Sequence, residues 1–119
     1  MKPAEKNMLI GAFATAAADI GLEGWYMYNM GKGTPLAEQI PYVSVGTPYL
    51  PPLDDWIANA GIPALFYLLG KSLKKDSLVQ MSKGGAIYGI SQLAGLTLYR
   101  TASQVAPASA RYVLANRRL

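Results

Sequence analysis

The chain has 119 residues, of which 51% are apolar and only 15% are charged, and its formal net charge is +4. An ordinary globular domain has about a quarter of its residues charged, so the composition favours a small all-α integral membrane protein. Cysteine and histidine are absent, which excludes disulfides, thiolate or imidazole zinc sites and catalysis that needs either residue. We expect no cofactor and no metal site. We also expect no nucleic-acid partner, because the basic residues form short clusters beside apolar segments.

The first predicted membrane span covers residues 8–30 and carries two carboxylates near its middle, Asp19 and Glu23. About 20 mostly apolar residues cross a bilayer, and this stretch supplies them. The two acids are four residues apart and share a helix face, which cannot point at lipid. Lys2 and Lys6 before an apolar run resemble a secretory signal, but the apolar pattern continues past Asp19 and favours an uncleaved anchor.

Residues 32–54 contain five prolines and are predicted to form an irregular external loop. Prolines at this spacing prevent a helix, because each removes a backbone donor and restricts the residue before it. We interpret the loop as a surface connector, with a re-entrant or partner-binding loop as the alternative.

The second predicted span covers residues 55–71 and has no charge between Trp56 and Gly70. Asp54 and Asp55 suit the positive end of a helix that begins there. Pro63 predicts a kink in this span. Aromatic and lysine side chains near the span ends are predicted to anchor the membrane interfaces, namely Trp25, Trp56, Lys71, Lys74 and Lys75.

The third predicted span covers residues 78–105. Its small residues, the GxxxG pair Gly85 and Gly89 together with Ser91 and Gly95, predict close contact with another helix. General packing is the alternative interpretation. The first and third spans run in the same direction, and side chains tilt toward the amino terminus of their helix. Arg100 is therefore predicted to form an ion pair with Glu23.

The tail, residues 107–119, is too short to span and is basic. It predicts an in-plane amphipathic helix, with an anionic lipid or protein as partner of Arg111, Arg117 and Arg118. The lysines between the second and third spans place that connection, and the amino terminus, on the cytoplasmic side of the membrane. The expected membrane is a prokaryotic cytoplasmic membrane, with a virion membrane as the alternative. The basic tail then lies outside, in conflict with the same rule.

Asp19 has no obvious basic partner in the chain. It is interpreted as a neutral or hydrogen-bonded acid in a helix interface, with two alternatives. One is a proton or cation relay. The other is a salt bridge to a separate subunit.

These features favour a non-catalytic small integral membrane subunit that packs in and stabilises a larger assembly, a membrane enzyme complex or a virion membrane. Its expected partners are other membrane protein subunits and the lipid bilayer. An enzyme acting alone is not expected, because no catalytic constellation can be assembled from these residues. The alternatives are a homo-oligomeric proton or cation channel or transporter component that uses Asp19 and Glu23, and a soluble all-α interaction domain.

Overall fold

The computed structural model describes residues 1–105, of which 79% are helical and none forms a strand. The prediction of an all-helical chain is therefore confirmed. The predicted tail helix, with Arg111, Arg117 and Arg118, lies outside the described residues. The elements are α1 (Pro3–Gly31), the 3-10 turn η1 (Leu36–Glu38), α2 (Leu53–Trp56), the π-helical turn η2 (Ile57–Gly61), α3 (Ile62–Leu73) and α4 (Asp76–Val105).

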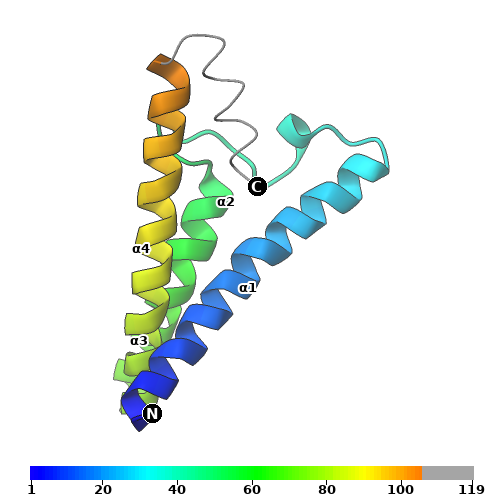
Figure 1. Cartoon of the computed structure of the whole chain (residues 1–119). Helices are drawn as coiled ribbons and strands as arrows, with labels where there is room; N and C mark the ends of the chain where they lie inside the picture. The colour runs from blue at the N-terminus through cyan, green and yellow to red at the C-terminus, as the bar shows by residue number, and fades with distance from the viewer. Residues whose placement is uncertain (106–119) are drawn as a thin grey trace.

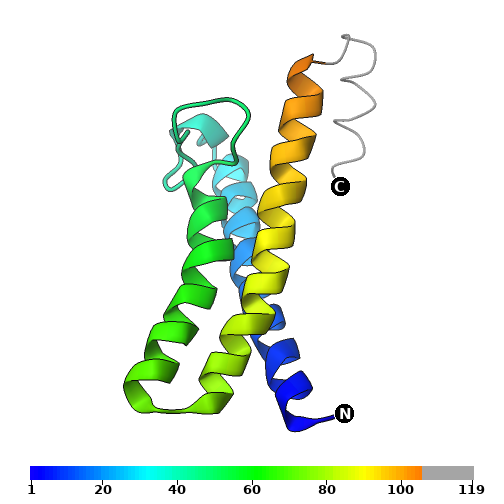
Figure 2. The same cartoon turned by 90° about the vertical axis from the view of Figure 1, so that its left-hand side faces the viewer.

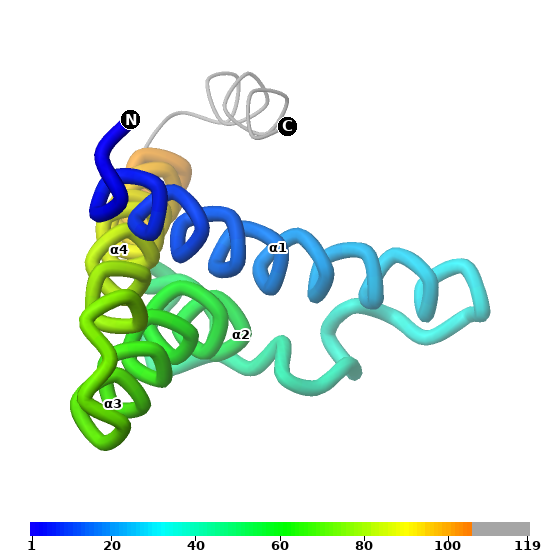
Figure 3. The backbone as a smooth tube through the Cα atoms, turned by 90° about the horizontal axis from the view of Figure 1, so that it is seen from below, coloured from blue at the N-terminus to red at the C-terminus, as the bar shows by residue number. Residues whose placement is uncertain are grey.

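The elements α2, η2 and α3 follow one another without a break and form one rod that lies beside α4 (Figure 2). The amino-terminal part of α1 packs against α4. Helix α1 then diverges from α4, so that the carboxyl-terminal end of α1 stands apart (Figure 1, Figure 3). The loop of residues 32–52 returns the chain from that far end to α2. Helices α1 and α4 run in the same general direction, and the rod runs against them.

No helix among residues 1–105 combines the length and the apolar character that a membrane crossing requires. The predicted spans 8–30, 55–71 and 78–105 are therefore wrong, and so are the integral membrane class and the location in a cytoplasmic or virion membrane. The physical reason lies in charge and length. Acids interrupt α1 at Asp19 and Glu23, α3 has only 12 residues, and Lys83 and Arg100 interrupt α4.

The aromatic residues assigned to membrane anchoring make local contacts instead. Trp25 is exposed and stacks on Tyr28 with ring centroids 6.1 Å apart. The Trp56 indole Nε1 donates a hydrogen bond of 3.0 Å to the carbonyl of Pro51 and so ties the loop to α2. The anchoring role predicted for these two residues is lost with the spans.

The lysines assigned to anchoring lie at the end of α3 and in the turn that follows. The Lys71 ammonium lies 5.7 Å from the centroid of the Tyr67 ring. Lys74 ends α3 in the left-handed conformation at φ 54°, and the Lys75 amide donates a 2.9 Å hydrogen bond to Gly70 O. These cations suit the negative end of the helix dipole.

Glycines let the helices approach backbone to backbone. A Cβ added to Gly11 would overlap the carbonyl of Met81, and one added to Gly84 would overlap the carbonyl of Met8. Both contacts lie where α1 crosses α4, so the crossing depends on residues without side chains. Helix α1 leaves α4 beyond this crossing (Figure 1).

The irregularity near Pro63 takes the form of the π-helical turn η2 directly before it. Proline has no backbone N–H, so the carbonyl of Asn59 lacks the donor that an α-helix would supply four residues later. That carbonyl faces Gly89 on α4, where a Cβ would overlap it. The rod therefore contacts α4 at the Asn59 carbonyl, which lacks its usual helical donor because of Pro63. Gly89 on α4 has no side chain that would obstruct this contact.

Candidate functional site

The interior of the described chain is polar and its surface is apolar. The buried hydrophobic residues within residues 1–105 are Tyr26, Ala58 and Leu93. Large apolar side chains lie instead on the outside of every long helix, as shown by Phe13 at 73% exposed and Leu98 at 70%. Apolar surface of this extent is typical of a protein that covers it with a partner.

Five of the seven buried polar residues in the described part of the chain form a cluster where α1 faces the start of the rod. Helix α1 supplies Thr15 and Asp19, α2 supplies Asp54 and Asp55, and η2 supplies Asn59. All five are at most 7% exposed. We call these residues, together with Tyr26 of α1, the polar cluster.

Hydrogen bonds to the backbone satisfy part of this cluster. The Thr15 hydroxyl donates to Gly11 O over 2.9 Å, and the Asn59 side-chain amide donates to Asp55 O over 2.9 Å. Oxygens without a hydrogen-bond partner are the Tyr26 hydroxyl, Asp54 Oδ1 and Asn59 Oδ1. Unsatisfied buried oxygens each cost free energy, so the cluster holds capacity for further polar contacts.

The acids and the phenol perturb one another. Burial raises the pKa of the Tyr26 phenol, and the negative charges of Asp54 and Asp55 raise it further. Burial also raises the pKa of the Asp54 carboxyl, with a smaller contribution from the charge of Asp19. The side-chain interaction between Tyr26 and Asp54 further raises the pKa of the phenol and partly opposes the rise in the pKa of the carboxyl.

The loop closes over the end of this cluster. The Gln39 side-chain amide donates to Tyr26 O over 3.1 Å and to Thr34 O over 3.3 Å. The ring of Tyr42 meets the ring of Tyr26 edge on, with centroids 5.8 Å apart. Within residues 1–105, no three or more acidic, histidine or cysteine side chains have the spacing of a metal site.

The structure separates the residues predicted to pair. Asp19 is buried in the polar cluster, whereas Glu23 is exposed on the part of α1 that has left α4 (Figure 1). Arg100 lies near the far end of α4 and its Nε donates a 3.0 Å hydrogen bond to Pro48 O in the loop. Helix α1 diverges from α4 beyond their crossing (Figure 1), and the printed hydrogen bond of Arg100 goes to the loop and not to Glu23.

The small residues of α4 divide into two groups. Gly85 faces the Thr15 hydroxyl and Gly89 faces Asn59, so both lie at helix contacts. Ser91 is exposed and donates to Ile87 O over 2.6 Å within its own helix. Gly95 has open space where a Cβ would stand.

The outward side of α1 carries an apolar stripe that Glu23 interrupts between its last two members. Its members are Leu9, Phe13, Ile20 and Met27, between 46% and 73% exposed, with Ala16 between them. Spacings of four and seven residues keep these side chains on one side of a helix. We call this surface the outer stripe.

A groove runs along the contact between the rod and α4. It consists of two adjoining apolar hollows of about 380 and 500 Å³ that share Ile90 and Leu93. We call it the α3/α4 groove. Small side chains form much of it, and its further lining includes Ala60, Ala64, Ala86, Ala94, Trp56 and Lys83.

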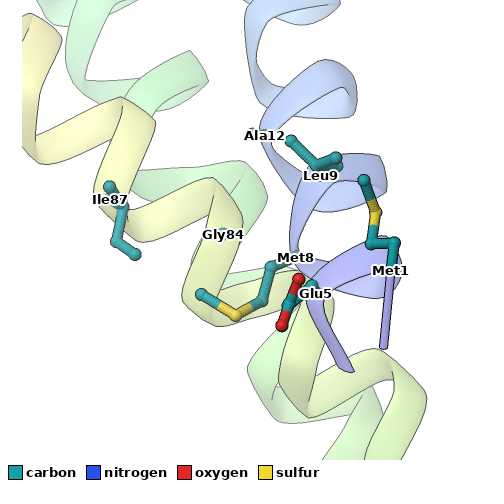
Figure 4. Close-up of a pocket in the computed structure, with 7 residues that line it drawn as sticks. All are labelled: Met1, Glu5, Met8, Leu9, Ala12, Gly84 and Ile87. Carbon is teal, nitrogen blue, oxygen red and sulfur yellow. The ribbon is translucent and has the colours of Figure 1, made fainter. Parts of the chain in front are cut away.

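A third hollow lies between α1 and α4 near the amino terminus (Figure 4). Met8 and Leu9 of α1 and Ile87 of α4 line it, and Glu5 lies at its edge. Gly84, which contacts the Met8 carbonyl, is also among its lining residues. Apolar hollows therefore lie on α4 both beside α1 and beside the rod.

No family model, curated protein or solved structure matches this chain. Inference about function therefore rests on the chain's own residues. Sequence reasoning identified Asp19 but missed that Asp54 and Asp55 are buried beside it and that Tyr26 joins them. The available signal was the proline loop, whose length lets the start of the second helix return to the middle of α1.

Proposed function

We propose that the chain is a non-catalytic helical subunit that packs into a larger protein assembly through its exposed apolar helix faces. The observation that carries the proposal is the inverted distribution of side chains, with polar residues and glycine inside and large apolar residues outside. Neighbouring subunits would complete the hydrophobic core that this chain does not build for itself.

The energetics support this reading. Burying one large apolar side chain contributes about 1.5–3 kcal/mol, and the described chain leaves residues such as Phe13, Ile20, Ile90 and Leu98 mostly exposed. A chain of this size is stable by only about 5–15 kcal/mol. Covering a few of these side chains with a partner would therefore change stability by an amount comparable to the whole free energy of folding.

The residue types favour a structural role over catalysis. The sequence has no histidine and no cysteine, and the buried acids Asp54 and Asp55 lie inside the fold rather than in an open cleft. The hollows are lined almost entirely by apolar side chains. Such surfaces bind by shape and apolar contact.

The test is the mass of the native particle in the source cells, measured on a tagged full-length chain after gentle lysis and chemical cross-linking. We expect particles of fixed stoichiometry, well above the 12.8 kDa of one chain. The variant Ile90→Glu should release the tagged chain, because it buries a charge in the α3/α4 groove.

The matched control is Ser72→Glu, which adds the same charge at an exposed polar position at the end of α3. It should leave the particle intact. A parent chain that migrates at the mass of a single copy under cross-linking contradicts the proposal. Equal release of the chain by Ser72→Glu and Ile90→Glu also contradicts it, because the effect would then follow from charge alone.

A further inference from the structure

We propose that the α3/α4 groove of one copy binds the outer stripe of α1 from a second copy. The inference rests on the proposed function, because it names the partner that covers two of the exposed apolar faces. The chain itself carries both halves of such a contact. Bulky side chains project from α1, and four alanines are among the residues that line the groove.

The two surfaces match in length. Glu5 and Glu23 lie on the same side of α1 as the outer stripe and are 18 residues apart, which corresponds to about 27 Å along a helix. Lys83 and Arg100 flank the groove and are 17 residues apart, which corresponds to about 26 Å. Both lie within the described residues on uninterrupted helices, α1 and α4.

The charges at the two ends are complementary. Glu5 precedes the outer stripe and Glu23 lies within it, whereas Lys83 lines one end of the groove and Arg100 follows its other end on α4. Lys83 is the one charged side chain that lines either hollow in the described part of the chain. Placing Glu23 of the second copy beside Lys83 brings Glu5 of that copy within a turn of Arg100. Opposite charges at matched spacing set the register of a contact.

The side-chain sizes favour an antiparallel arrangement of the docked α1 and α4. With Glu23 beside Lys83, Ala16 lies opposite Ile90, one of the two large residues shared by the two hollows. Ile20 then lies opposite Ala86, and Phe13 lies opposite Leu93 and next to Ala94. At Ile90 and at Ile20 a large side chain of one helix thus meets a small one on the other, which favours close helix packing.

The contact also accounts for Glu23 and Arg100. Within one chain the divergence of α1 from α4 keeps these residues apart (Figure 1). Between two copies the same acids and bases face one another along one groove. The divergence leaves the outer stripe of α1 accessible to a second copy.

The test uses two variants, each disabled on one surface. Phe13→Glu places a charge in the outer stripe, and Ile90→Glu places one in the groove. Both positions are exposed, 73% and 66%, so folding of the single chain should survive, which circular dichroism verifies. Light scattering should show the parent as an oligomer and each variant as a single chain of 12.8 kDa.

Mixing the two variants is the decisive step. Each variant retains the surface that the other has lost, so the mixture should form a 1:1 dimer. The self-association of either variant alone should be weakened by about a hundredfold or more. Leu65→Glu is the control, since Leu65 is 53% exposed on α3 but lines neither hollow. It should assemble like the parent.

The register is tested separately by charge reversal. Glu23→Lys and Lys83→Glu should each weaken the oligomer, and the chain carrying both changes should recover it, because each reversed charge meets its reversed partner on the other copy. These positions are exposed, so the reversal also decides the matter if Phe13→Glu does not fold.

The outcomes separate this inference from the proposed function. A parent chain that stays single when purified, yet forms a fixed-ratio particle with unlike chains in cells, overturns the second-copy contact and leaves the proposed function standing. A chain that is single in both settings overturns both. Failure of the mixed variants to form a dimer, with an oligomeric parent, overturns this pair of surfaces.

Discussion

Substitution of Gly89 by alanine tests how the rod and α4 are held together. In an ordinary helix interior this change is stabilising by about 0.5–1 kcal/mol, because alanine loses less conformational entropy than glycine. At Gly89 the new Cβ would overlap the carbonyl oxygen of Asn59. That oxygen belongs to the backbone of η2 and cannot rotate away as a side chain could.

The magnitude follows from two opposing effects. Overpacking of a well-packed contact costs about 1–3 kcal/mol, and a backbone-to-backbone overlap belongs in the upper part of that range. Subtracting the helix gain leaves a net loss of about 1–2 kcal/mol for Gly89→Ala. Gly95→Ala is the matched control on the same helix, where the new Cβ meets open space and should stabilise the fold by up to about 1 kcal/mol.

The assay is urea unfolding followed by circular dichroism, at one protein concentration because self-association would shift the midpoint. Gly89→Ala should unfold at lower urea than the parent, and Gly95→Ala at equal or higher urea, with similar slopes. Equal stability of the two variants would refute the reasoning, since it would mean that the rod does not lie against Gly89.

Three further predictions concern single residues of the fold. Lys74→Gly should raise the free energy of unfolding by about 1 kcal/mol, because Lys74 has φ 54° and glycine adopts that conformation without strain, and Lys75→Gly, which lacks that benefit, should not. The raised pKa of Asp54 means that the folded chain binds the carboxyl proton more tightly than the unfolded chain does. The stability that this protonation contributes is therefore fully present below the ordinary pKa of 3.8 and is lost as the pH rises through the folded-state pKa. Asp54→Asn should flatten this decline of stability with pH, whereas Glu38→Gln, at an exposed acid, should leave the slope unchanged. Tyr26→Phe should keep or raise the urea midpoint, by up to about 1 kcal/mol, because it removes a buried hydroxyl without a hydrogen-bond partner, and a clear loss of stability would show that the hydroxyl is satisfied.

The helices were predictable because their signals are local. Prolines mark the loop, the acids Asp54 and Asp55 mark a helix start, and the long charge-poor runs have the composition of helices. The environment of those helices was not predictable in the same way. Apolar residues on an exposed helix face and apolar residues that face lipid look alike in a sequence, so residues such as Phe13 were read as part of a membrane span.

The polar cluster was only partly predictable for a different reason. Asp19 stands out because it interrupts an apolar run, but burial of Asp54 depends on how far α1 tilts away from α4. That tilt is set by the contacts of Gly11 with Met81 and of Gly84 with Met8, which are 70 and 76 residues apart in sequence. Periodicity within a single helix carries no information about which glycine meets which backbone.

The position of the glycines explains why the polar and apolar faces are inverted. Helices that touch through Gly11, Gly84 and Gly89 come too close for large side chains between them, so small and polar residues occupy the interior. Large apolar side chains are then left on the outer faces, where only another molecule can cover them. Close packing inside and apolar surface outside are thus two results of one arrangement. A change that moves the helices apart, such as Gly89→Ala, should therefore also alter the α3/α4 groove and weaken assembly.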